Sequence, residues 1–107
     1  MIKEDMTVIM GRINILFKRK LQTFYRIEVV NDKFDHTYNF FFRTQPKNQR
    51  ISSVPLHTIK NYDLTYLEKL INHIQKQTNL SIEYIGFENL KWPTTNQLIQ
   101  KRARRDE

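Results

Sequence analysis

The sequence predicts an α+β domain, and three features support this fold class. Residues 64–78 repeat apolar side chains at helical spacing. Three segments before them alternate apolar and polar residues with a period of two, which is typical of strands with one buried face. A fourth alternating segment follows. We therefore expect an antiparallel sheet of three to five strands (β-β-β-α-β-α order), with one amphipathic helix packed on one face and a short C-terminal helix.

The helix expected over residues 64–78 has a start, an apolar face and an end. Asp63 can cap the free N–H groups of its first turn, and Thr65 with Glu68 forms an alternative capping box. Asn79 is a candidate left-handed residue that ends the helix. The apolar face needs a partner surface and consists of Leu64, Leu67, Leu70, Ile71 and Ile74.

The three strands expected before this helix cover residues 7–18, 22–30 and 36–44. In the first, Ile13, Ile15 and Phe17 share one face, and we expect this face to pack on the helix. Residues 18–20 and 31–33 have the charged and amide side chains of exposed turns. Connections this short join neighbouring antiparallel strands, so the three strands should form a meander.

Residues 45–61 are the least regular stretch. Pro46 and Pro55 exclude a central strand or a helix interior. The stretch is long for a connection within one domain, so it either contains a short strand near residues 50–54 or is a functional loop.

Two further elements are expected after the helix. Residues 80–87 predict a fourth strand, and residues 96–104 predict a short helix whose apolar contacts are Leu98 and Ile99. We see no repeat, linker or low-complexity tract. Residues 1–107 therefore form a single domain.

Composition excludes several classes of protein. No run of about eighteen apolar residues predicts a membrane-spanning helix, and the charged N-terminus does not match a signal peptide. The chain has no cysteine, which excludes a disulfide framework and fits a reducing, cytoplasmic location. We expect a cytoplasmic protein that does not contact membranes.

Net charge is the strongest compositional signal. Eighteen Lys and Arg residues against eleven Asp and Glu residues give +7. Residues 1–60 hold eleven basic and five acidic side chains, a net charge of +6, and residues 61–100 hold three and four, a net charge of −1. The final residues 101–107 return to +2. Such a charge favours a polyanionic partner, and the alternative is that it only aids solubility.

Catalytic and metal-binding patterns are nearly absent. His36, His57 and His73 are far apart and have no HxxxH or HxxEH neighbours. Asp35 beside His36 is only a pair, whereas a closed structural metal site needs four ligands. Two glycines cannot build a phosphate-binding loop. We therefore expect no catalytic residues, no metal and no cofactor.

Two groups of basic residues are candidate nucleic-acid contacts. In a meander, residues 18–20 and the region after the third strand share one end of the sheet, flanked by Tyr25 and Phe41, which either stack on bases or belong to the core. The C-terminal group suits a phosphate backbone, although a solvated terminus explains the same charges. The candidates are Lys18, Arg19, Lys20, Arg43, Lys47, Arg50, Lys101, Arg102, Arg104 and Arg105.

Three functions are compatible with these patterns. The leading hypothesis is a non-enzymatic protein that binds DNA or RNA through phosphate contacts. The second is a small inhibitor or adaptor of phage or mobile-element origin, which binds a protein such as a nucleic-acid-processing complex. Ile, Lys and Asn, which have AT-rich codons, make up 31 residues and fit such an origin. The third is a small ribonuclease or toxin that acts through Arg, Lys, Tyr and His.

Overall fold

The computed structural model describes residues 2–17 and 22–100. Within them the chain is an α+β fold, as its sequence predicts, but the elements come in the order α-β-β-β-α-β. These elements are α1 (Ile2–Leu16), β1 (Thr23–Asp32), β2 (Thr37–Pro46), β3 (Ser52–Ile59), α2 (Leu64–Gln77) and β4 (Ser81–Ile85).

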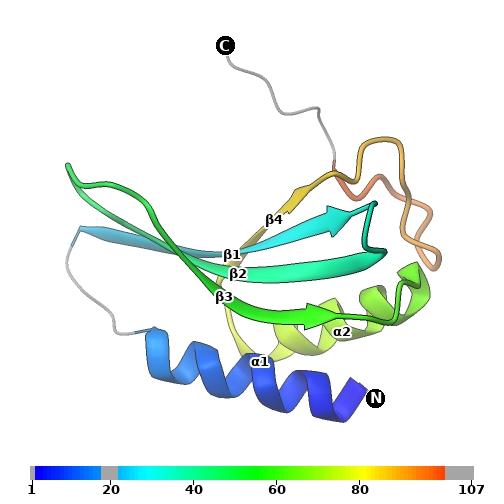
Figure 1. The fold of residues 1–107 in the computed structure, drawn as a ribbon, viewed down its shortest axis with the longest axis horizontal. Coiled ribbons are helices and arrows are strands. Elements are labelled where there is room, and N and C mark those ends of the chain that lie inside the picture. The colour runs from blue at the N-terminus through cyan, green and yellow to red at the C-terminus, as the bar shows by residue number, and fades with distance from the viewer. Residues whose placement is uncertain (1, 18–21, 101–107) are drawn as a thin grey trace.

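The four strands form one mixed sheet in the order β3-β2-β1-β4 (Figure 1). β1 pairs antiparallel with β2, and β2 pairs antiparallel with β3, which gives the expected meander with different members. β4 pairs with β1 in parallel, so the expectation of a purely antiparallel sheet is wrong. The cause is topological: β3 runs in the same direction as β1, and α2 returns the chain so that β4 starts at the same end as β1.

Both helices lie on the same face of the sheet (Figure 1). In α2 the predicted apolar face is buried, since Leu67, Leu70, Ile71 and Ile74 are at most 3% exposed. This face packs into one core with buried residues of α1 and of three strands, and the strand residues are Ile27, Val29, Tyr38, Phe40, Phe42, Leu56 and Ile59.

The prediction of a strand over residues 7–18 is wrong, because this segment belongs to α1. Ile9 and Ile13, one helical turn apart, are 0% and 2% exposed, whereas Ile15 is 70% exposed. Ile13 therefore joins the core from a helix and not from the sheet. Ile13 and Phe17 are four residues apart, so part of the alternating pattern also fits a helix. Ile9 and Ile13 are likewise four residues apart, and this spacing places both on the buried face of α1.

The start of α2 is confirmed and its predicted end is wrong. The Asp63 side chain accepts a hydrogen bond from the Thr65 N–H at 3.2 Å. Thr78 ends the helix with an extended φ of −148°, and Asn79 does not adopt a left-handed conformation. Glu68 is buried and accepts from the Thr94 N–H at 3.2 Å, so it does not serve the alternative capping box.

The irregular stretch after β2 contains β3, which is longer than the strand predicted near residues 50–54. Pro55 is tolerated because β3 is an edge strand, and its pairing register shifts between Phe40 and Phe41.

Residues 96–100 do not form the helix predicted there, and residues 101–104 of that prediction lie outside the described residues. An isolated bridge pairs Lys91 with Leu98, and Asn96 has a left-handed φ of 59°. Ile99 is 5% exposed and enters the core, while Leu98 is 41% exposed. Backbone turns therefore replace the helix.

Candidate nucleic-acid interface

One face of the sheet carries no helix (Figure 1). Side chains alternate between the two faces along a strand. Since Ile27 and Val29 are buried on the helix side, their neighbours point to the other side, which we call the open face. Its central residues are Arg26 and Glu28 of β1, Phe41 and Arg43 of β2, and Glu83 of β4.

Four charged side chains on the open face form a chain of ion pairs, in the order Arg26, Glu83, Arg43 and Glu28. Arg43 donates a hydrogen bond to the Glu28 carboxylate. Arg26 Nε and Arg43 Nη1 lie 3.4 and 3.8 Å from the same atom, Glu83 Oε1. In the strand register, like charges face each other, Arg26 against Arg43 and Glu28 against Glu83. The contacts between arginines and glutamates described above offset this repulsion. The charge of Arg43, a candidate phosphate contact, is thus matched within the protein.

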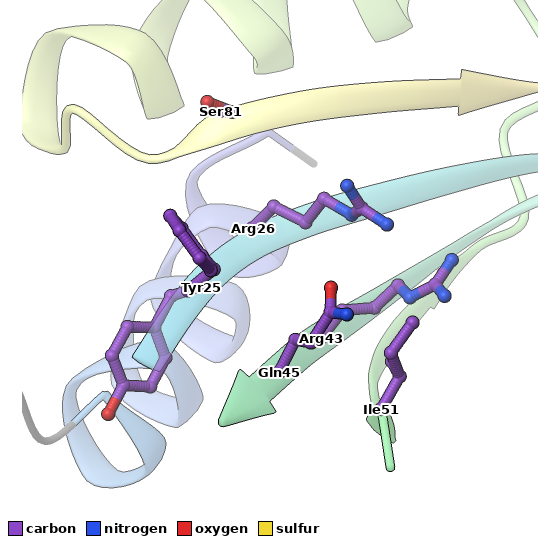
Figure 2. A pocket seen from close by; sticks show the side chains of 7 residues that line it. Tyr25, Arg26, Arg43, Gln45, Ile51 and Ser81 are labelled. Carbon is purple, nitrogen blue, oxygen red and sulfur yellow. The ribbon is translucent and has the colours of Figure 1, made fainter. Parts of the chain in front are cut away.

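At one end of the open face, two depressions adjoin an exposed aromatic ring. We call this end of the open face the hairpin end, because β1 and β4 begin there and β2 turns into β3 there (residues 22–26, 43–52 and 81). Phe24 is 75% exposed. One depression, of about 180 Å³, extends from Ser81 past Arg26 to Ile51 (Figure 2). The other, of about 460 Å³, shares Phe24 and Gln45 with the first and continues along residues 46–48.

Two candidate cations, Lys47 and Arg50, lie in the connection between β2 and β3 and are exposed. The connection is a tight turn, because Asn48 has a left-handed φ of 63° and the Gln49 N–H donates to Pro46 O at 3.2 Å. The Lys47 N–H donates to Gln22 O at 2.8 Å. The turn is therefore fastened to the residue that leads into β1, and both cations belong to the hairpin end.

The other seven candidates lie outside the described residues, and the sequence shows how much charge they bring. The described residues hold eleven Lys and Arg and nine Asp and Glu, a net charge of +2. Residues 18–21 add three basic side chains, and residues 101–107 add four basic and two acidic ones. These two segments therefore carry +5 of the +7. The seven candidates are Lys18, Arg19, Lys20, Lys101, Arg102, Arg104 and Arg105.

Tyr25, expected to flank the basic residues, packs on the helix side. Its ring centroid lies 4.7 Å from that of Phe17 and 5.8 Å from that of Phe42, so it packs against the core as a partly buried residue. The exposed ring of the hairpin end is that of Phe24, which was not among the residues predicted from the sequence. Its signal was present, because Phe24 shares the polar, period-two face of its strand with Arg26.

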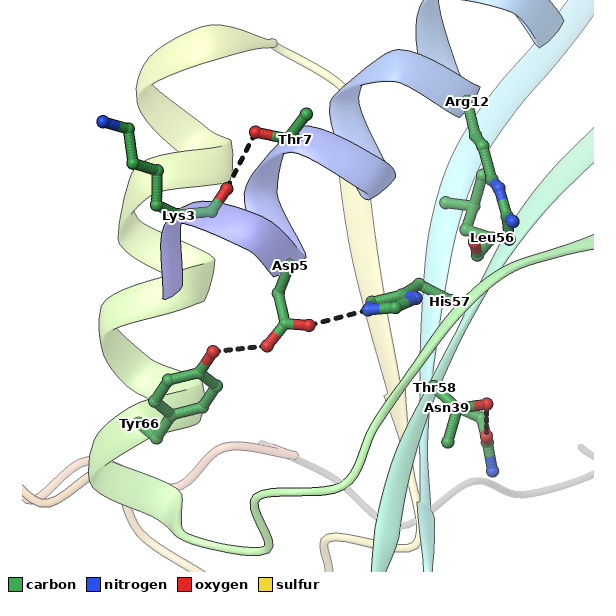
Figure 3. A network of polar contacts seen from close by, with 9 residues as sticks. All are labelled: Lys3, Asp5, Thr7, Arg12, Asn39, Leu56, His57, Thr58 and Tyr66. Atoms are coloured by element: carbon green, nitrogen blue, oxygen red, sulfur yellow. Dashed lines mark hydrogen bonds and ion pairs between the residues drawn. The ribbon is translucent and has the colours of Figure 1, made fainter. Parts of the chain in front are cut away.

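A second polar cluster fastens α1 to the rest of the fold (Figure 3). The Asp5 carboxylate accepts a hydrogen bond from the Tyr66 hydroxyl of α2, and its other oxygen lies 2.7 Å from His57 Nε2 of β3. Burial, together with the hydrogen bond to Asp5, raises the pKa of Tyr66. His36 and His73 are exposed and lie on other elements. Among the described residues, no group of three or more His, Asp or Glu side chains is arranged to hold a metal ion.

Comparisons of the chain with protein-family models, with curated proteins and with solved structures find no match. In the part of the chain that the structure describes, neither helix combines the length and apolar content needed to cross a bilayer.

Proposed function

We propose that this chain is a non-enzymatic nucleic-acid-binding protein of the cytoplasm. The observation that carries the proposal is the hairpin end, where an exposed aromatic ring, two depressions and two exposed cations adjoin a helix-free sheet face. The basic residues 18–20 directly precede this end in the sequence. Cations grip phosphates, and an exposed ring can stack on bases.

The paired and the unpaired cations have different roles in this proposal. Arg26 and Arg43 face carboxylates at 3.4 and 3.8 Å and so contribute little net attraction. Lys47 and Arg50 are exposed and form no ion pair with a described residue. Together with residues 18–20 they provide five cations for phosphate contacts. Residues 101–105 supply further basic side chains.

Fluorescence anisotropy with short DNA and RNA, both single-stranded and duplex, tests the proposal. Each phosphate contact releases counterions, so affinity falls with salt. Five contacts predict a log–log slope of about −4.5 for duplex DNA and about −3.5 for a single strand. Dissociation constants weaker than about 10⁻⁴ M for every probe, the weak end of non-specific affinity, would refute nucleic-acid binding.

A matched pair of triple variants localises the contacts. The change of Lys18, Arg19 and Lys20 to Ala should flatten the log–log slope by about 2 to 3. It should also weaken binding to nucleic acids of all sequences alike. The control changes Lys33, Lys69 and Lys91 to Ala; these exposed lysines lie away from the hairpin end. It removes the same charge and should keep a slope near that of the wild type. Equal flattening in both variants would show that attraction is spread over the whole surface.

A protein-binding inhibitor or adaptor is the second candidate, favoured by Phe34 at the β1–β2 turn. Phe34 is 97% exposed, and the turn is held because Asp32 Oδ1 accepts from the N–H groups of Phe34 and Asp35, both at 3.1 Å. Exposed aromatic anchors of this kind are common binding hot spots. A pull-down from the native host, with and without nuclease, decides between the candidates. A partner that survives nuclease and is lost in Phe34→Ala would favour the adaptor.

The non-enzymatic part of the proposal has its own test. The purified chain, incubated with labelled RNA and DNA, should leave the substrates intact. Cleavage that is lost in His57→Gln or His36→Gln, with folding retained, would identify a nuclease instead.

A further inference from the structure

We infer that the nucleic acid bound by this protein is single-stranded and that a base stacks on Phe24 at the hairpin end. This inference rests on the proposed function and deepens it, because phosphate contacts alone do not distinguish a single strand from a duplex. Its basis is the position and surroundings of Phe24 on the open face.

The Phe24 ring is presented by a strand rather than by a loop. Phe24 pairs with Gln45 in the register of β1 and β2, so its backbone is fixed by the sheet. Its side chain is 75% exposed, and it lies between the two depressions, to both of which it contributes. The sheet therefore fixes the position from which the ring projects and leaves the ring accessible to a planar ligand.

The neighbours of Phe24 favour a base over a phosphate. Arg26 and Arg43 are matched by Glu83 and Glu28, so this part of the face is nearly neutral. A neutral surface with guanidinium and amide groups suits the polar edge of a base. Free cations begin at the adjacent β2–β3 turn, where the phosphates of the same strand can lie.

The shape of the site favours an unpaired strand over a duplex. In a duplex the faces of the bases are stacked on one another, so an aromatic ring on a sheet can stack only on an unpaired base. The sheet is four strands wide, and strand spacing makes this about 15 Å. A few nucleotides can lie across it.

The test compares Phe24→Ala with Phe34→Ala in the full chain. Phe34 is also a highly exposed aromatic, but it lies at the opposite end of β1. The probes are fluorescein-labelled single strands of about twelve nucleotides, in DNA and RNA forms, and the duplexes of the same sequences. A urea titration of each variant verifies that the fold is retained.

Phe24→Ala should weaken single-strand binding by roughly 5- to 150-fold, the range for loss of one base–aromatic stack. It should leave duplex binding and the salt slope unchanged, because no phosphate contact is removed. Phe24→Trp should keep the affinity, and Phe34→Ala should behave as the wild type.

The outcomes separate this inference from the proposed function. If the wild type binds neither single strands nor duplexes, both fail. If it binds with the expected salt slope, but Phe24→Ala changes nothing or weakens single strands and duplexes equally, the function stands and the stacking inference is overturned. Equal losses in Phe24→Ala and Phe34→Ala would overturn it as well.

Discussion

Replacing Arg43 by Ala should destabilise the fold by roughly 3 kcal/mol, although Arg43 lies on the helix-free face of the sheet. Its side chain is 16% exposed and donates to Glu28, whose side chain is 10% exposed. Removing one partner of a buried ion pair leaves the other charge desolvated, which costs about 3–5 kcal/mol. We expect the lower part of this range, because the side chain of Glu83, the second partner, is 31% exposed.

Urea unfolding followed by circular dichroism measures this loss. In a domain of this size, about 3 kcal/mol corresponds to a fall in Tm of roughly 10–20 °C. A double-mutant cycle with Glu28→Gln identifies the cause. The double variant has no buried carboxylate at position 28, so it should be more stable than the sum of the single losses predicts, by about 1–3 kcal/mol.

Arg26→Ala is the matched control. Arg26 is on the same face and pairs with Glu83, but its side chain is 38% exposed, so its loss should be below about 1 kcal/mol. If Arg43→Ala costs less than about 0.5 kcal/mol, the surface range, or if the cycle is additive, then the network is solvated. Arg43 would then be available to phosphates, as the sequence first indicated.

Three further predictions concern the core, the attachment of α1 and the response to alkali. Leu70→Ala in α2 removes a fully buried side chain and should cost about 2–5 kcal/mol; a loss below about 0.5 kcal/mol in urea unfolding would show that α2 is not docked. Asp5→Ala removes the acceptor shared by Tyr66 and His57 and should cost about 1–3 kcal/mol by the same measurement; an unchanged midpoint would contradict the role of this cluster. Burial raises the pKa of Tyr84 to about 12, from about 10 in an unfolded chain. The native state therefore keeps a proton that the unfolded state loses, so stability is full below about pH 10 and falls as pH rises towards 12. Tyr84→Phe should make this fall shallower, and equal falls between about pH 8 and pH 11 in both proteins would refute the burial effect.

The elements that the sequence predicts correctly are those with only one dominant period. The apolar residues of α2 fit a helical face and no other pattern, and residues of β1 and β2 alternate over long stretches. In α1 two periods overlap: Ile13, Ile15 and Phe17 alternate, while Ile9 and Ile13 are one helical turn apart. The choice between them depends on burial against α2, which is a tertiary property.

Other features depend on information that local patterns do not contain. The direction of β4 follows from the path of α2 across the sheet, so residues 81–85 alone cannot specify parallel pairing. The pairing of Arg43 with Glu28 depends on the register of β1 against β2. Before the register is known, Arg43 resembles any other free cation. The position of Phe24 on the polar face of its strand, in contrast, follows from the period-two alternation alone.

The distribution of charge along the chain links the salt series to the Phe24 series. The described residues carry only +2, while residues 18–21 and 101–107 carry the other +5. Phosphate contacts made by these segments act on any sequence and set the slope of affinity against salt. A stacked base releases no counterion, so loss of the Phe24 ring lowers affinity by the same factor at every salt concentration. The slope of affinity against salt therefore reports on the basic segments. The loss of affinity that is the same at every salt concentration reports on the ring on the open face.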